Sequence, residues 1–180
     1  MASLHHVKKS NAGKPIKCGE CEKEIAPGTM YYWWAFFRGP RFVRCEEHKP
    51  RPSQLINSKM APAYGAIETA EAAINKAGAT IEDIAAALEE CAGEIEAVRD
   101  DYQEGYDNMP DFAQNGATGE DSQNKIDELE NFASNLNSVA EEIRAMENDD
   151  GEAGGGDNPE SDSVKQAIET ATQALDEFSL

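Results

Sequence analysis

Two short motifs near the start of the 180-residue chain carry the residues best suited to chemistry. Cys18 and Cys21 are separated by two residues, and Cys45 and His48 repeat this spacing 23 residues further on. Two intervening residues let one tight turn direct both side chains at a single ion. Three thiolates and one imidazole fill the tetrahedral coordination of Zn²⁺ and leave no position for water or substrate. The spacing therefore predicts one structural zinc ion on these four residues, and no catalytic or other cofactor-binding residue is assigned.

The segment between the ligand pairs predicts a β-hairpin. Residues 30–37 are strongly strand-forming, residues 38–41 contain Gly39 and Pro40 and form a turn, and residues 42–44 return. A knuckle, a hairpin and a second ligand pair make a treble-clef or zinc-ribbon arrangement, which we place at residues 17–55. So small a module has little apolar core, so zinc should supply most of its folding energy, roughly 10 kcal/mol or more.

The remaining chain predicts helices. Residues 1–16 are expected to be a flexible basic arm, and residues 62–147 an acidic helical region with a loop near 108–120. Thr80 and Asp83 resemble a capping box after Gly78, which indicates a fresh helix start or a kink there. Apolar residues at spacings of three and four favour an antiparallel, coiled-coil-like hairpin. The expected buried positions are Ile81, Ile84, Leu88, Cys91, Ile95, Val98 and Tyr102, then Ile126, Leu129, Phe132, Leu136, Val139, Ile143 and Met146.

The end of the chain predicts two further segments. Residues 148–162 are expected to be a disordered acidic linker, because they hold no aliphatic side chain larger than alanine. Residues 163–180 are expected to form an amphipathic helix that either docks on the hairpin or captures a partner. The predicted fold is thus a small zinc-bound α+β module followed by a mainly α, coiled-coil-like helical hairpin. Self-association through the helices stays open.

Charge is distributed very unevenly along the chain. Residues 1–60 hold eleven Lys and Arg against five Asp and Glu, a net charge of +6, whereas residues 61–180 hold five against thirty, a net charge of −25. The sum of −19 disfavours non-specific contact with nucleic acid or an anionic membrane. No apolar run reaches the roughly 18 residues of a membrane span. No signal peptide is recognised either, so we expect a cytoplasmic protein without a membrane partner, in which thiols stay reduced.

The aromatic run at residues 30–37 is apolar on both faces of any strand, since neighbouring side chains point in opposite directions. One face should therefore contact something else: the helices of the same chain, a protein partner, or nucleic acid. Aromatic rings beside basic residues suit both protein interfaces and single-stranded nucleic acid. The candidate contact residues are Lys17, Tyr32, Trp33, Trp34, Arg38, Arg41, Arg44, Lys49 and Arg51.

Three functions compete on this evidence. The first is a non-enzymatic adaptor or regulator, in which the aromatic and basic zinc module recognises a protein. The second is a nucleic-acid-binding zinc finger. The third is an acidic helical DNA mimic that inhibits a DNA-binding host protein, although a solvated helix face is the commoner reason for many carboxylates. An enzyme is not expected, because the sequence has no Gly-rich phosphate loop and no spaced nucleophile with a base.

The segments around the ligands resemble small zinc-finger proteins of tailed bacteriophages. The resemblance rests on residues 17–21 and 44–55 with the Tyr-Tyr-Trp-Trp stretch between them, and on residues 102–110 and 125–130. It covers about residues 17–147 and implies a phage origin and the host-cell cytoplasm, but no activity. In that group Cys often stands at the position of His48, and either residue binds zinc.

Overall fold

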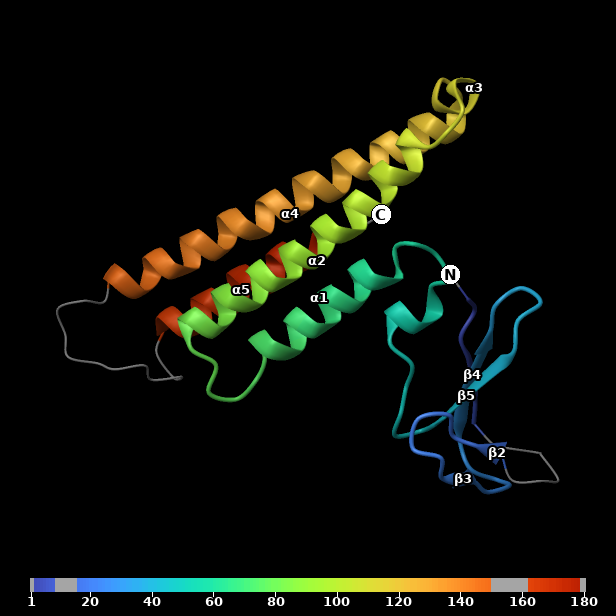
Figure 1. Cartoon of the computed structure of the whole chain (residues 1–180). Helices are drawn as coiled ribbons and strands as arrows, with labels where there is room; N and C mark the ends of the chain where they lie inside the picture. The colour runs from blue at the N-terminus through green and yellow to red at the C-terminus, as the bar shows by residue number, and fades with distance from the viewer. Residues whose placement is uncertain (1, 9–15, 150–161, 179–180) are drawn as a thin grey trace. The chain divides into compact units, whose positions relative to one another are not determined.

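The computed structural model describes residues 2–8, 16–149 and 162–178. The chain divides into two compact units, Met1–Ala61 and Pro62–Leu180, whose elements are traced in Figure 1. The first unit is built of short strands and the second of helices, and each is described by itself.

A three-stranded antiparallel sheet forms the centre of the first unit. β4 (Tyr31–Ala35) and β5 (Arg41–Cys45) make the predicted hairpin, and β1 (His5–Val7) pairs with the other edge of β4. β2 (Ile16–Lys17) and β3 (Glu24–Ile25) form a two-stranded ribbon, and the 3₁₀ helix η1 (Pro52–Leu55) follows β5. Tyr31 lies opposite Cys45 across the hairpin, so the register brings the aromatic strand beside the third predicted ligand.

The strand β1 corrects the prediction of a flexible arm at residues 1–16. His5 lies opposite Trp33 and its ring stacks on the indole with the centroids 4.0 Å apart. His6 stacks on the neighbouring Tyr32 at 4.7 Å. The rings of β4 provide stacking partners for β1. The sequence of β1 alone does not indicate that such partners exist. Residues 9–15 of the predicted arm lie outside the described part of the chain.

The core of the first unit is built around three of the predicted ligands. Cys18, Ile25 and Tyr31 are buried together, and Cys21 and Cys45 are among the partly buried residues packed against them. The other partly buried members of this cluster are Val7, Ile16, Trp33 and Val43. The apolar core and the candidate metal site are therefore one structure, as expected for a module this small.

The helices of the second unit begin with a clear break. α1 (Ala61–Ile74) and α2 (Ile81–Asp107) are separated by Gly78, whose φ is +81°. The backbone N–H of Asp83 donates to Thr80 Oγ1 at 3.1 Å, and the Thr80 N–H donates to Asp83 Oδ2 at 3.0 Å. The predicted capping box is confirmed, and α2 is a fresh helix rather than a kinked continuation.

α2 and α4 (Ala117–Asp149) lie side by side as the predicted helical hairpin (Figure 1). One buried row on each helix alternates at spacings of four and three. It consists of Ile81, Ala85, Leu88, Ala92 and Ile95 in α2, and of Ile126, Leu129, Ala133, Leu136, Ala140 and Ile143 in α4. The predicted seam residues Ile84, Cys91, Val98 and Phe132 are buried as well. The predicted seam residues Tyr102, Val139 and Met146 are half-buried. The coiled-coil geometry stays a prediction.

The connection between α2 and α4 differs from the predicted loop at 108–120. A short helix, α3 (Asp111–Gln114), occupies its middle, and α4 begins at Ala117 rather than near residue 121. A Cβ atom on Gly119 would lie only 2.0 Å from the carbonyl oxygen of Gln114. Gly119 therefore permits close packing of backbone inside a helix, whereas the sequence suggested that it marks a turn.

The last helix, α5 (Asp162–Asp176), packs within the second unit. Val164, Ala167, Ala171, Ala174 and Leu175 are buried. Just beyond the helix, the Phe178 ring lies 5.1 Å from that of Tyr64 and 4.7 Å from that of Phe132. The helix predicted for 163–180 is present and docked in this structure, where Ile168 is half-buried.

The linker predicted at 148–162 lies mostly outside the described residues, but Asn148 and Asp149 belong to α4 and Asp162 to α5. Among the described helices, none has the length and apolar character needed to cross a bilayer.

Candidate metal centre

The four predicted ligands converge in the first unit. The ligand atoms of Cys18, Cys21, Cys45 and His48 all lie within 4.8 Å of one another, and no other such group occurs among the residues that the structure describes. Cys21 Sγ lies 3.9 Å from Cys45 Sγ, and Cys45 Sγ lies 3.0 Å from His48 Nδ1. These residues are close enough to bind a metal ion, and the set is consistent with one zinc.

Two tight turns present the ligands. After β2, the Glu22 N–H donates to the Cys18 carbonyl at 3.0 Å, and Glu22 takes the left-handed φ of +58°. At the end of β5, the His48 N–H donates to the Cys45 carbonyl at 3.1 Å. The first turn closes over three residues and the second over two, and each brings the two ligand atoms of its pair to the same site, as the spacing predicted.

Cys18 differs from the other ligands in its surroundings. It is 1% exposed, and its Sγ accepts hydrogen bonds from the backbone N–H groups of Glu20 and Cys45, both at 3.4 Å. Burial raises the pKa of Cys18, but backbone hydrogen bonds from Cys21, Cys45 and Glu20 outweigh it and bring the pKa to about 6. Cys18 is therefore the thiol most ready to ionise.

Ionisation of a second thiol, that of Cys45, is unfavourable at this site. Burial, hydrogen bonds to the Cys18 and Cys21 side chains and the charge of Cys18 all raise the pKa of Cys45. A divalent cation removes this conflict, because it neutralises the charge that the thiolates place on one another. Three sulfurs and one nitrogen fit Zn²⁺ in a closed tetrahedral site, where the ion would hold the two turns together and supply no catalytic chemistry.

Several predicted contact residues are engaged within the first unit. Trp33 is covered on its ring by His5 at 4.0 Å and by the Arg41 guanidinium at 3.9 Å. Arg44 Nη2 lies 2.9 Å from Glu20 Oε2. Tyr32 and Trp34 also have stacking partners, in His6 and Phe42, and Trp34 is only 2% exposed. Lys17, Arg38, Lys49 and Arg51 are exposed.

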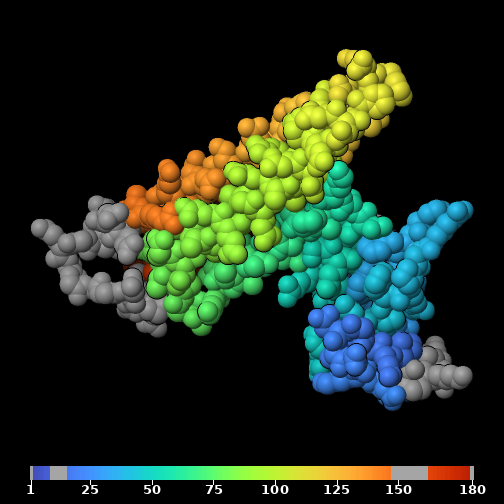
Figure 2. Space-filling model, in the orientation of Figure 1, coloured from blue at the N-terminus to red at the C-terminus, as the bar shows by residue number. Residues whose placement is uncertain are grey.

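Phe37 belongs to the aromatic run whose one face was expected to contact something else, but it was not among the candidate contact residues. Its side chain is 90% exposed in the turn that joins β4 to β5, where Arg38 has a φ of +57° and the Gly39 N–H donates to the Phe36 carbonyl at 2.9 Å. This turn stands out from the first unit as a narrow projection (light blue in Figure 2). Phe37 ends an aromatic run and lies shortly before Gly39, and this position was the signal available in the sequence.

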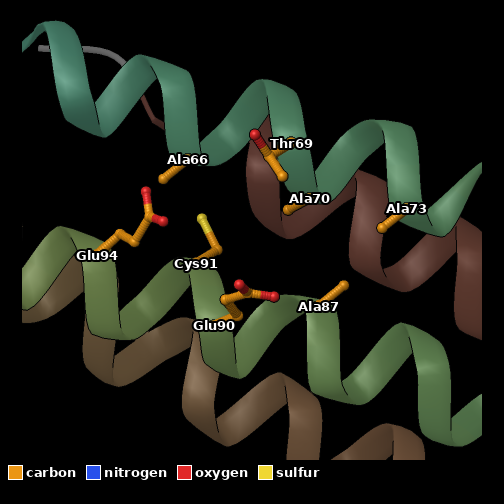
Figure 3. Close-up of a pocket in the computed structure, with 8 residues that line it drawn as sticks. All are labelled: Ala66, Thr69, Ala70, Ala73, Ala87, Glu90, Cys91 and Glu94. Atoms are coloured by element: carbon orange, nitrogen blue, oxygen red, sulfur yellow. The ribbon is translucent and has the colours of Figure 1, made fainter.

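Cys91 lies apart from this centre, as predicted. It is 2% exposed in α2, and burial raises the pKa of its thiol to about 12. Figure 3 shows it in a narrow crevice between α1 and α2, lined by small side chains and by Glu90 and Glu94. The crevice holds ≈ 30 Å³, about the space of one water molecule. Cys91 is a buried, unreactive thiol.

No family model matches the chain, and the comparisons with curated proteins and with solved structures found no match either. The resemblance to phage zinc-finger proteins therefore stays an expectation from the sequence. What the chain can do must be argued from its own geometry.

Proposed function

We propose that the chain is a non-enzymatic adaptor or regulator, in which one structural Zn²⁺ folds a small recognition module that contacts a protein partner. The observation that carries this proposal is the convergence of four ligand atoms within 4.8 Å inside the core of the first unit. A closed Cys₃His set serves folding rather than catalysis, since every coordination position belongs to the protein.

The surface offered to a partner is the sheet and its projecting turn. Residues 5–7 and 31–45 contain no Asp or Glu, and Arg38 and Arg41 are exposed among them. Phe37 is 90% exposed, and the Arg38 guanidinium carbon lies 5.1 Å from the centre of its ring. Aromatic residues and arginine are enriched at the energetic centres of protein interfaces. This composition supports a partner with an apolar pocket and acidic neighbours.

Nucleic acid is the weaker alternative for this surface. Base stacking requires an open aromatic face, and the Trp33 ring already contacts both His5 and Arg41. Phosphate binding requires available cations, and Arg44 is paired with Glu20. Exposed Lys17, Lys49 and Arg51 keep the alternative testable: affinity for single- and double-stranded DNA or RNA would fall steeply with salt if phosphates are bound.

The DNA-mimic alternative rests on the helical unit alone. Its net charge of −25 over residues 61–180 resembles a polyanion, but many carboxylates on a soluble helix face need no partner. If the helical unit captures a DNA-binding protein, and the capture does not depend on zinc, this alternative would be favoured over the adaptor.

The test uses the full chain, zinc analysis and a matched pair of variants. Elemental analysis should give one zinc per chain. Phe37→Ala removes the exposed ring of the first unit, and Phe112→Ala removes the other strongly exposed ring, 83% exposed, from the helical unit. In capture experiments from bacterial lysate, we expect partners to be lost with Phe37→Ala and with a chelator, and retained with Phe112→Ala. Identical partners in all samples, or a chain without zinc, would contradict the proposal.

A further inference from the structure

Two ion pairs connect the first pair of ligands to the second. Glu20 lies between Cys18 and Cys21, and its carboxylate meets Arg44, the residue before Cys45, at 2.9 Å. Lys23 and Glu47 span the same two turns at 3.4 Å. Each of these connections joins residues more than 20 positions apart and is made by the protein without help from the ion.

The two pairs differ in burial. Both side chains of the Lys23–Glu47 pair are 70% exposed, so water screens their attraction. The Arg44 side chain is only 14% exposed, and its guanidinium carbon lies 5.6 Å from the centre of the Trp34 ring. A Cβ atom on Gly19 would come within 2.6 Å of Arg44 Nη1, so a side chain at this position would displace the guanidinium.

The Glu20–Arg44 pair, here called the brace, lies beside the two backbone donors to Cys18 Sγ. Cys18 Sγ accepts from the N–H of Glu20 on one side and from the N–H of Cys45 on the other. The brace joins the first donor residue to the neighbour of the second. It therefore links the two backbone segments whose N–H groups donate to Cys18 Sγ.

The brace acts through orientation rather than through charge, because Glu20 neutralises the Arg44 guanidinium. Residues that orient ligands in this way commonly raise metal affinity by about 10- to 100-fold.

Given the zinc site proposed above, we infer that Arg44 is a positioning residue for the metal: with Glu20 it holds the two ligand turns in register and strengthens zinc retention. Arg44 thus serves the metal site rather than the surface that meets a partner.

The test is a double-mutant cycle on zinc affinity in the full chain, measured by competition with a chromophoric chelator. We expect Arg44→Met and Glu20→Gln each to raise the zinc dissociation constant by about 10-fold, and the double variant to be little worse than either alone. The matched cycle on Lys23→Met and Glu47→Gln should change affinity by less than about twofold. Gly19→Ala keeps both charges but displaces the guanidinium, and it should weaken zinc binding in the same direction as Arg44→Met.

Three outcomes would overturn the inference. The first is that the two cycles change the zinc affinity equally. The second is that the effects of Arg44→Met and Glu20→Gln simply multiply in the double variant. The third is that Gly19→Ala leaves the zinc affinity unchanged. Helical circular dichroism and tryptophan fluorescence of the zinc-loaded variants verify folding, and if Arg44→Met does not fold, Glu20→Gln and Gly19→Ala decide. A wild-type chain that binds no zinc would overturn the proposed function together with the brace, whereas a zinc-binding chain with an inert brace refutes this inference alone.

Discussion

The two units of this chain are stabilised in different ways. In the first unit, Ile25 and Tyr31 are buried beside Cys18, and Trp34 is buried against Phe42, so the apolar core is small and part of it adjoins the metal site. In the second unit, α2 and α4 bury a continuous row of aliphatic and alanine side chains along their length. With the zinc site proposed above, one unit depends on an ion and the other on apolar burial.

This difference teaches that the chain should lose its structure in two separable steps. The probes for the steps are also separate, because Trp33 and Trp34 are the only tryptophans of the chain and both lie in the first unit. Tryptophan fluorescence therefore reports on the zinc module, whereas helical circular dichroism reports mainly on the second unit.

Removal of the metal should have the largest effect. A chelator, or Cys18→Ser, should unfold the first unit, since structural zinc contributes roughly 10 kcal/mol or more to modules of this kind. The Trp33 and Trp34 fluorescence should shift to longer wavelength while helical circular dichroism changes little. Fluorescence that is unaffected by chelation would show that the first unit does not depend on an ion.

Truncation of the helical core should come next. Leu129→Ala removes a side chain that is 0% exposed between α2 and α4, and it should cost about 2–5 kcal/mol of the unfolding free energy. Thermal unfolding followed by circular dichroism measures this loss. Zinc affinity serves as the control and should stay unchanged, and a large change in it would contradict the independence of the two units.

Loss of the helix cap should have a smaller effect in the same unit. Thr80→Ala removes the acceptor for the Asp83 N–H, at a cost of about 1 kcal/mol. The hydrogen bonds from Thr80 also hold the pKa of Asp83 below its ordinary value. Thr80→Ser should retain both properties, whereas Thr80→Ala keeps the backbone hydrogen bond to Asp83 and loses the one from the hydroxyl. A melting temperature that is the same in Thr80→Ala and wild type would show that the side-chain cap does not stabilise the helix.

The smallest effect concerns Arg144, whose guanidinium on α4 donates to Glu82 at 3.0 Å and to Glu89 on α2. These hydrogen bonds lower the pKa of both carboxyl groups below the ordinary value of 4.5. A carboxyl whose folded-state pKa is lowered adds stability above its unfolded-state pKa, and loses it as pH falls through the folded value. The melting temperature of wild type should therefore exceed that of Arg144→Gln near pH 7.

The gap between these melting temperatures should close as the pH falls from about 4.5, the ordinary pKa of glutamate, through the lowered folded-state pKa values of both carboxyl groups. Thermal scans of the two proteins across this range measure the difference. A gap that is the same at both ends of the range would show that the ion pairs do not contribute to the stability of the helical unit.

Much of this architecture was predictable because it follows from local chemistry. The ligand pairs, the β4–β5 hairpin and the Thr80 cap each depend on residues close together in the chain, whose types allow few alternatives. The rows of apolar residues in α2 and α4 were predictable for the same reason, since helical periodicity is written into the sequence.

The features that were wrong or missed depend on contacts between distant segments. β1 forms because Tyr32 and Trp33 offer rings to two histidines more than 20 positions away. Gly119 lies inside α4, where the Gln114 backbone comes so close that a side chain would not fit. Arg44 was expected at a partner surface, but it forms an ion pair with Glu20. No local sequence pattern predicts a pair between residues so far apart in the chain.

The strand β1 has a practical consequence for anyone who isolates the zinc module. Boundaries drawn from the ligand spacing would begin an expression fragment at residue 17, and such a fragment would leave out His5, His6 and the whole outer strand. The indole of Trp33 and the phenol of Tyr32 would then each expose a ring face that β1 covers in the intact chain. A fragment intended to stay monomeric and soluble should therefore start ahead of His5.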